Sequence, residues 1–317
     1  MAKTVLITGA TGFVGAYLAN KIAKNDNVHI IIRRNSDTWR LNSIIKNLNT
    51  HYADLTNPID VDVAIQAINP EIIYHFAAYG TAASQNDFQQ IIKANTLGTF
   101  NLFQACKKIN FPIFINTGSS SEYGKKNKLM QEADLLEPNT GYGIAKASQT
   151  LLAQHFGREN DLPIVTLRFF SVYGPYESPT KLMPRLITAC QNHHDLTLTS
   201  PDSAHDFVFV DDVVKACISA ANTSGLNGEI INIGSGKQTS LREVVDTVKA
   251  LTRADDIKEN WGAIPDPTYD SKTWVADITK AKRLLDWQPN YNLVQGLAET
   301  INWFNNNQKT MEKKYVV

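Results

Sequence analysis

Residues 5–15 read Val5-Leu6-Ile7-Thr8-Gly9-Ala10-Thr11-Gly12-Phe13-Val14-Gly15, an apolar run that stops at a glycine and continues as a helical pattern. Gly9 permits a tight turn, Gly12 lets backbone N–H groups approach a pyrophosphate, and Gly15 lets the helix pack on the strand. The positive end of the helix dipole then stabilises the phosphate charge. The strand before these glycines and the helix after them favour a dinucleotide site over an ordinary strand-to-helix turn.

Apolar strand patterns alternate with helical patterns through residues 4–170. This alternation predicts an α/β fold, a Rossmann-like doubly wound parallel sheet with a smaller C-terminal substrate domain. The strands are expected at 27–32, 70–78, 111–117 and 162–170, a long helix at 87–109, and further helices near 182–192, 211–223, 240–253 and 293–305.

A Gly174-Pro175 break marks the expected domain boundary. Residues 1–171 are predicted to form the cofactor-binding domain, with return segments near 206–235. Residues 172–317 then form mainly the substrate domain.

Composition narrows the function classes. The 317 residues carry 31 basic and 31 acidic side chains, so the formal net charge of zero gives no support for a nucleic-acid partner. The three cysteines are scattered without metal-ligand spacing, so no metal site is expected. No apolar run reaches the ~18 residues of a membrane span. The chain enters a strand within a few residues, so we expect no signal peptide and a cytoplasmic protein.

The segment Tyr142-Gly-Ile-Ala-Lys146 is the main catalytic candidate. Residues four apart share one face of a helix, so the Lys146 ammonium is expected to lie near the Tyr142 phenol and to favour the phenolate. An unperturbed tyrosine titrates near ~10, which is too high for proton exchange at neutral pH. The preceding strand ends in Ser119, which gives the pair a candidate hydrogen-bonding partner.

Two polar residues at strand ends have competing interpretations. Arg33 ends the second strand, where an acidic side chain would accept the ribose 2′-OH of NAD. A guanidinium there suits a 2′-phosphate, so NADP(H) is expected over NAD(H), although NAD(H) stays possible and a solvated basic turn is the alternative. A lone histidine on an apolar strand is more often a core residue, so His75 is expected to be structural.

These motifs together resemble the extended short-chain dehydrogenase/reductases, in the branch of nucleotide-sugar epimerases, dehydratases and 4-ketoreductases. Later markers include His205-Asp-Phe-Val-Phe-Val-Asp211 and Ile231-Asn-Ile-Gly-Ser235. The resemblance implies that Ser119 hydrogen-bonds the sugar oxygen, Tyr142 moves its proton, and Lys146 also holds the nicotinamide ribose. It further implies cofactor contacts from Gly9, Thr11, Gly12, Phe13, Val14, Gly15, Arg33, Arg34, Asp54, Leu55, Phe76, Ala77, Ala78, Thr117, Tyr142, Lys146, Phe169 and Val172.

Substrate contacts are expected where the branch binds its sugar diphosphate, and this chain departs from the pattern there. His205 stands where the branch usually has arginine, and Ser171 where it usually has asparagine. Phosphate binding could fall instead to Lys181, Arg185 or Lys272, which could equally be solvated surface charges. The substrate-binding candidates are Ser119, Ser120, Ser171, Lys181, Arg185 and His205.

The reaction type is the least constrained expectation. A dehydratase of this branch usually has Asp-Glu after the catalytic Ser/Thr, whereas Ser120 and Ser121 stand here, and Glu122 would face away if the strand continued. Arg33 makes NADPH-dependent reduction of a 4-keto-6-deoxy NDP-sugar the first expectation, in deoxysugar nucleotide biosynthesis. An NDP-sugar 4-epimerase is the alternative, and a 4,6-dehydratase or a non-catalytic NADP-binding regulator is weaker. The 87–109 and 142–156 helices resemble those that pair in homodimers of the family.

Overall fold

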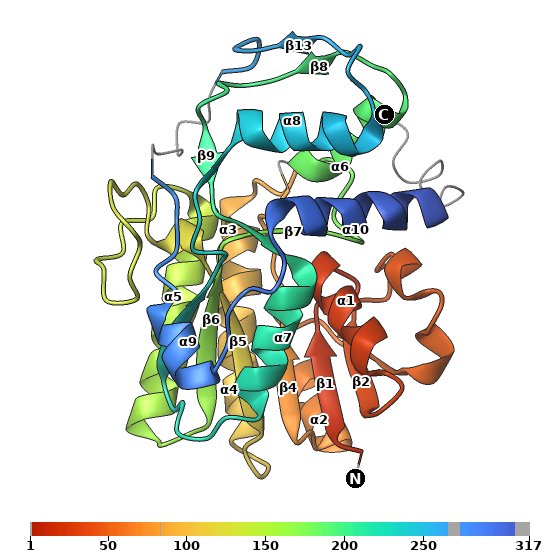
Figure 1. The fold of residues 1–317 in the computed structure, drawn as a ribbon. Helices are drawn as coiled ribbons and strands as arrows, with labels where there is room; N and C mark the ends of the chain where they lie inside the picture. The colour runs from red at the N-terminus through yellow and green to blue at the C-terminus, as the bar shows by residue number, and fades with distance from the viewer. Residues whose placement is uncertain (1, 83, 266–272, 308–317) are drawn as a thin grey trace.

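The computed structural model describes residues 2–82, 84–265 and 273–307. A seven-stranded parallel sheet forms its centre, in the order β11-β6-β5-β4-β1-β2-β3 (Figure 1). This order runs outward in both directions from the β1–β4 pair, as in a doubly wound sheet, and confirms the predicted fold class. The strands are β1 (Thr4–Thr8), β2 (Asn27–Ile32), β3 (Asn49–Tyr52), β4 (Ile72–His75), β5 (Ile113–Ser119), β6 (Ile164–Phe169) and β11 (Glu229–Ile233).

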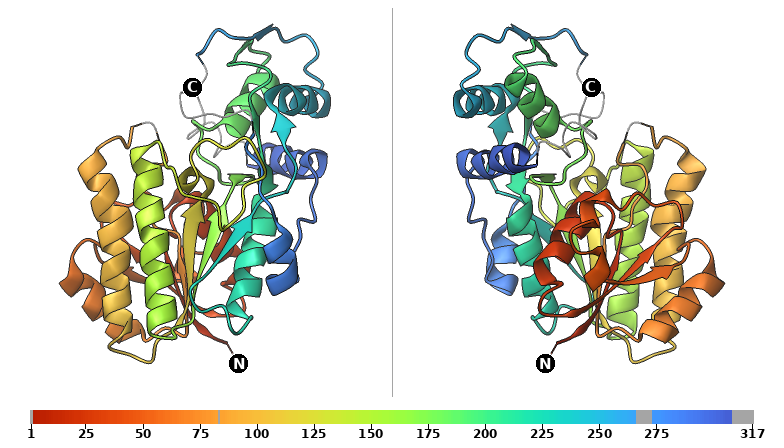
Figure 2. Two further views of the ribbon diagram at one scale, coloured as in Figure 1. Left: turned by 90° about the vertical axis from the view of Figure 1, so that its left-hand side faces the viewer. Right: turned by 90° about the vertical axis from the view of Figure 1, so that its right-hand side faces the viewer.

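Helices cover both faces of the sheet, as Figure 2 shows. Neighbouring strand residues point to opposite faces, so Val5 and Ile7 enter one apolar core while Leu6 enters the other. The first core is shared with α1 (Phe13–Ile22), α7 (Val210–Ala221) and α9 (Thr279–Leu285), and the second with α2 (Pro58–Ile68), α4 (Gly98–Cys106) and α5 (Gly141–Glu159). Short 3₁₀ turns complete this part: η1 (Trp39–Leu41), η2 (Ile45–Asn47) and η4 (Ser120–Glu122).

A smaller lobe lies above the carboxyl ends of the main strands (Figure 1). Its own apolar core joins side chains such as Leu186, Val245 and Ile301 from three helices. The lobe contains α6 (Leu182–Gln191), α8 (Leu241–Thr252), α10 (Leu293–Asn306) and three strand pairs, β7 (Ser171–Tyr173) with β10 (Phe207–Phe209), β9 (Ala204–His205) with β12 (Thr239–Ser240), and β8 (Leu196–Thr197) with β13 (Glu259–Asn260).

The helix expected over residues 87–109 is interrupted. It consists of α3 (Phe88–Ile92), a π turn η3 (Lys93–Leu97) and α4. Inside the π turn, the buried Asn95 amide donates to the Tyr79 carbonyl at 2.7 Å and to the Ile91 carbonyl at 2.9 Å. The Asn95 side-chain oxygen accepts the Tyr79 N–H. One side chain therefore connects the helix to the loop after β4. π turns are rare and often occur at functional sites.

Asp206 joins the lobe to the main sheet. Its buried carboxylate accepts hydrogen bonds from the Ser235 N–H and hydroxyl, and from the N–H groups of Gly236 and Ala276. These donors come from the loop after β11 and from the chain that leads into α9. A carboxylate with four donors fixes three segments that are distant in sequence.

No helix in the described part of the chain is long and apolar enough to cross a lipid bilayer. The three cysteines are buried free thiols. No group of three or more potential metal-ligating side chains occurs among the described residues.

His75 lies fully buried at the end of β4. Its ring nitrogens contact the hydroxyl groups of Thr8 at 2.6 Å and Thr99 at 2.7 Å. Burial lowers the pKa of His75 to about 3, and the Lys146 charge acts in the same direction. The ring is therefore a neutral hydrogen-bonded link between β1, β4 and α4.

We predict that His75 makes stability depend on pH below neutrality. Its folded pKa of about 3 lies under the unfolded value of 6.5, so the unfolded chain binds the extra proton between these values. Stability from this group is present above pH 6.5 and is lost as pH falls, by about tenfold in the folding constant per unit. Urea unfolding at several pH values should therefore show a shallower loss for His75→Gln, and parallel pH slopes for the two proteins would contradict the assignment.

Candidate active site

The carboxyl ends of four neighbouring strands meet at one edge of the sheet, beneath the smaller lobe. Strand register pairs Thr8 with His75, His75 with Asn116, and Ser119 with Phe169. The glycine turn, the segment after β4 and the end of β5 are therefore brought to the same edge. Ligands of doubly wound sheets bind outside this edge.

Tyr142 lies in the first turn of α5. Thr140 caps this helix by accepting the Gly143 N–H at 3.0 Å. A Cβ atom on Gly143 would lie only 2.5 Å from the Ser121 carbonyl oxygen, so glycine lets the helix approach the end of β5 closely. In this position the Tyr142 phenol and the Ser119 hydroxyl are close enough for Ser119 to affect the pKa of the phenol.

The environment of Tyr142 raises the pKa of its phenol. Burial is the largest cause, the Glu122 charge adds to it, and the hydrogen bond with Ser119 opposes it in part. The sequence predicted the reverse direction, with Lys146 lowering this pKa. In the structure the phenol is therefore held protonated.

Lys146 is 1 % exposed and points toward the sheet. Its ammonium donates to the Thr117 carbonyl at 2.5 Å and to the Gln149 side chain at 2.7 Å. Burial lowers the pKa of Lys146 to about 8, and the Glu122 charge opposes that shift. These two acceptors hold the ammonium against the sheet.

Two buried amides that the sequence motifs did not mark support Lys146. Gln149 donates to the Asn116 side chain at 2.6 Å, and Asn116 donates in turn to the Thr166 hydroxyl at 3.0 Å. Gln149 lies three residues after Lys146, so it shares the inward face of α5. That spacing is the only signal in the sequence that could have found it.

Glu122 does not face away from Ser119. The strand stops at Ser119, and the η4 turn brings the Glu122 carboxylate back to accept the Ser119 N–H at 2.7 Å. The same carboxylate accepts the Thr150 hydroxyl at 3.0 Å and forms an ion pair with Arg168 at 2.8 Å. All of its oxygens are thus used for structure, and the expected orientation was wrong because it assumed a continuous strand.

The glycine turn fits a dinucleotide. Gly9 has a φ of +70°, and a Cβ on it would lie 2.5 Å from the Ala77 nitrogen. Gly12 is the N-cap of α1, which has no side-chain cap and no acidic residue in its first turn. A Cβ on Gly15 would clash with the Gly9 carbonyl. The first N–H groups of α1 therefore have no side-chain cap and can bind an anion.

Other residues expected at the cofactor lie around this turn. Arg33 follows β2 and is exposed, while the Arg34 guanidinium lies 5.3 Å from the centre of the Tyr52 ring. Asp54 accepts the N–H and hydroxyl of Thr56, which shapes the turn after β3. The other candidates lie at or near strand ends. Thr11, Phe13 and Val14 follow β1, and Phe76, Ala77 and Ala78 follow β4. Thr117 lies in β5, Phe169 ends β6, Val172 lies in β7, and Leu55 lies beside Gly98.

The substrate candidates separate into two groups. Ser120 accepts the Trp274 indole N–H at 3.1 Å, and the Trp274 ring lies 5.7 Å from that of His205. Trp274 was missed because no sequence motif marked it as a candidate. The structure thus joins Ser120 to His205 through Trp274.

The remaining candidates are more dispersed. Lys181 donates to the Thr81 carbonyl at 2.6 Å, in the loop that also approaches Tyr142. The Ser171 N–H donates to the Asp206 carbonyl, while Arg185 is exposed on α6. Lys272 lies outside the described residues.

A glycine turn into α1, with a serine, a tyrosine and a lysine at the neighbouring strand end, defines a nicotinamide-dependent enzyme of the extended short-chain dehydrogenase/reductase class. The NAD-dependent epimerase/dehydratase family matches residues 5–234, and the chain belongs to this family. The class expected from the sequence is confirmed, and so is the expectation that the protein is an NAD(P)-dependent enzyme.

Similar proteins act on nucleotide sugars. An uncharacterized UDP-glucose epimerase of Bacillus subtilis, YtcB, is 29% identical over 94% of this chain and 96% of its own. UDP-glucuronic acid 4-epimerase from Bacillus cereus, solved with UDP-glucuronic acid and NAD, has a TM-score of 0.85 and 29% identity over 95% of this chain and 99% of its own. UDP-glucose 4-epimerase from Thermotoga maritima, solved with UDP-glucose, has a TM-score of 0.88 and 26% identity over 96% and 99%.

Proposed function

We propose that this protein is an NAD(P)-dependent 4-epimerase of a nucleotide sugar. The observation that carries the proposal is that Ser119 and Tyr142 lie together beside the buried Lys146, at the edge where the glycine turn lies. The relatives support this function better than the 4-ketoreductase expected first from the sequence, because several are named as 4-epimerases.

The chain's own residues can serve the proton steps of epimerisation. The C4 hydroxyl must lose its proton and later regain it on the same oxygen, so one group that both accepts and donates is sufficient. Tyr142 is that group, and the Ser119 hydroxyl orients the sugar oxygen beside it. Lys146 is the nearby cation that can favour the phenolate if it exchanges its contact with Thr117 or Gln149. When bound at the glycine turn, the cofactor supplies reversible oxidation and reduction at C4.

The end of β5 supports epimerisation over dehydration. Eliminating water across the sugar ring needs an additional acid and base near Ser119. Ser120 instead contacts Trp274, and the Ser121 hydroxyl contacts Ser119. Glu122 forms an ion pair with Arg168. No carboxylate is left for that role in this turn.

We further propose that the sugar diphosphate lies between the lobes, near Ser120, Ser171, Lys181, Arg185 and His205. Trp274 supports this location, because its ring and the His205 ring form a surface next to Ser120. Lys181 adds a positive charge at the loop beside Tyr142, where its ammonium donates to the Thr81 carbonyl.

Product analysis tests the reaction. UDP-glucose, UDP-glucuronic acid and UDP-N-acetylglucosamine are each incubated with the protein and a trace of NAD⁺ or NADP⁺, and the sugars are separated by chromatography. We expect one pair of 4-epimers to interconvert without net loss of cofactor. Tyr142→Phe should reduce turnover by about 10²-fold, since it removes the proton-transfer group, while Tyr291→Phe should not. Stoichiometric NADPH consumption with a 4-keto-6-deoxy sugar nucleotide, and no epimerisation, would establish the reductase instead.

We also propose that the site prefers NADP(H). Arg33 and Arg34 directly follow β2, where an NAD-specific site would have an acidic residue. Their guanidinium groups suit a 2′-phosphate. The Bacillus cereus epimerase was solved with NAD, so both cofactors need to be compared.

Calorimetric titration tests this preference. The unaltered protein should bind NADPH more tightly than NADH. Arg33→Asp should reverse the order, because the carboxylate repels the 2′-phosphate and accepts a ribose hydroxyl. Arg283→Asp, an exposed change on α9, is the matched control and should leave both affinities unchanged. Tighter binding of NADH by the unaltered protein would exclude the proposal.

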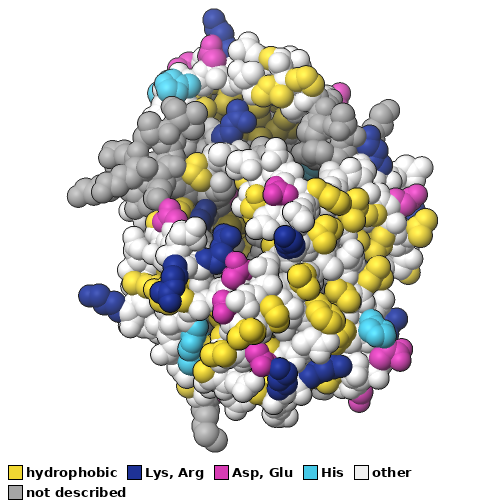
Figure 3. Space-filling model, turned by 180° about the vertical axis from the view of Figure 1, so that it is seen from behind, with side chains coloured by type: hydrophobic (Ala, Val, Ile, Leu, Met, Phe, Trp, Pro, Cys, Tyr) yellow, Lys and Arg dark blue, Asp and Glu magenta, His cyan; other side chains and the backbone are white. Residues whose placement is uncertain are grey.

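We propose a homodimer formed through the face that carries α3, α4 and α5. Phe88, Leu97, Ile144 and Leu151 are large apolar side chains, each 41–54% exposed, on these adjoining helices. Figure 3, seen from behind, shows hydrophobic side chains gathered on this face among scattered charges. Exposed apolar patches of this kind are typical of protein interfaces.

Light scattering tests the association. The unaltered protein should have twice the 35.3 kDa mass of the chain. Leu151→Glu places a charge in the apolar face and should shift the mass toward the monomer, whereas Val294→Glu on α10 should not. A monomeric unaltered protein at micromolar concentration, or a Leu151→Glu protein that stays dimeric, would count against this interface.

A further inference from the structure

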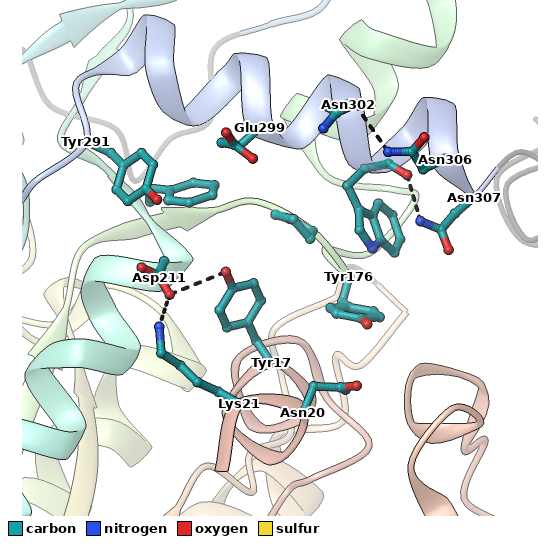
Figure 4. Close-up of a pocket in the computed structure, with 13 residues that line it drawn as sticks. Tyr17, Asn20, Lys21, Tyr176, Asp211, Tyr291, Glu299, Asn302, Asn306 and Asn307 are labelled. Atoms are coloured by element: carbon teal, nitrogen blue, oxygen red, sulfur yellow. Dashed lines mark hydrogen bonds and ion pairs between the residues drawn. The ribbon is translucent and has the colours of Figure 1, made fainter. Parts of the chain in front are cut away.

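A cavity of about 510 Å³ lies between α1, the start of α7, and α10. This volume falls in the range of small-molecule sites. None of its lining residues belongs to the catalytic set, the cofactor candidates or the substrate candidates. Figure 4 shows Tyr17 on α1 facing Glu299 and Asn302 on α10 across the open space. The two walls therefore come from the main sheet layer and from the smaller lobe.

Aromatic rings form one side of this cavity. Tyr176 packs against Trp303 with ring centres 4.9 Å apart and planes tilted by 59°. Tyr17 meets Tyr176 edge to face, at 77°. Because no two of these rings are parallel, they offer no slot for a flat base stacked on both sides. They do offer single ring faces on which an aliphatic C–H surface can pack.

Amides and a carboxylate line the α10 wall beside Trp303. Asn306 donates to the Asn302 side-chain oxygen at 3.2 Å, and no described residue accepts from the Asn302 amide nitrogen. Asn302 and Glu299 lie three residues apart on α10, so they share one face of the helix. Together they provide both hydrogen-bond donors and acceptors on this face.

The charge of the cavity disfavours an anionic ligand. Lys21 is the only basic residue among the described lining residues, and its ammonium is bonded to Asp211. Asp211 also pairs with Lys215 at 2.9 Å and accepts from the Tyr17 hydroxyl at 3.4 Å. Glu299 adds a further negative charge. No cation is therefore left for a phosphate.

We propose that this cavity binds a neutral monosaccharide unit. A pyranose ring has an aliphatic face that packs on one aromatic ring, and hydroxyl groups in its plane that reach amides and carboxylates. Trp303 and Tyr176 supply the ring face, and Asn302 and Glu299 supply the polar contacts. The site is separate from the catalytic edge, so it does not depend on the proposed epimerase activity.

Calorimetry with methyl α-D-glucoside tests the proposal, because this sugar carries no phosphate and has no free anomeric carbon. The titration is done with the catalytic cleft filled by UDP and cofactor. We expect saturable binding with a Kd of about 1–10 mM, typical of a small neutral ligand. Sugar binding should also change the tryptophan fluorescence, and Trp303→Phe should remove that change.

Matched variants on α10 locate the site. Asn302→Ala should weaken glucoside binding about fivefold, as expected for one net hydrogen bond. Asn305→Ala changes the same residue type on the same helix outside the cavity and should leave binding unchanged. UDP-sugar binding should be the same in all three proteins, which separates this cavity from the cleft.

Three results would overturn the proposal. The first is no saturable glucoside binding up to about ten times the expected Kd. The second is binding that Asn302→Ala and Trp303→Phe leave unaltered. The third is inorganic phosphate binding in this cavity more tightly than the glucoside.

Discussion

The buried ion pair between Glu122 and Arg168 is the interaction on which the catalytic edge depends. Both side chains are at most 1 % exposed, and their charged groups are 2.8 Å apart. Arg168 also donates to the Tyr123 hydroxyl at 2.7 Å, and Tyr123 donates to Asn232 of β11 at 2.7 Å. Removing one member of such a pair leaves an uncompensated buried charge, which costs about 3–5 kcal/mol. The pair therefore fixes β5, β6 and β11 relative to one another.

This constraint reaches Ser119 through the backbone. Glu122 accepts the Ser119 N–H, and its other contact, Thr150, lies on α5 two turns after Tyr142. The same carboxylate thus contacts the strand end that carries Ser119 and the helix that carries Tyr142. Its charge has an electrostatic effect as well, because it raises the pKa of Tyr142 after burial and opposes the lowering of the pKa of Lys146. A structural ion pair consequently tunes both proton-active groups.

Sequence patterns predicted the parts of this arrangement that are local. The glycine turn and the Tyr142–Lys146 helix each lie within about a dozen residues, and their geometry follows from turn and helix rules. The fate of Glu122 was not predictable in that way, since its partner lies 46 residues further along the chain. Nor did the pattern reveal that β5 ends in a 3₁₀ turn, because three serines before a glutamate are compatible with either backbone.

The same distinction between local and long-range contacts explains why the sequence predicted the family but not the substrate. Ser119, Tyr142 and Lys146 come from one strand–helix unit, so the class of chemistry could be inferred from their order in the chain and from the family resemblance of the combined motifs. Ser120, His205 and Trp274 come from three separate segments. Asp206 brings the last two together, because it is adjacent to His205 and accepts the Ala276 N–H at 3.0 Å. The surface proposed to contact the sugar nucleotide therefore forms only when the lobe packs around the Asp206 carboxylate. No local sequence pattern encodes its shape.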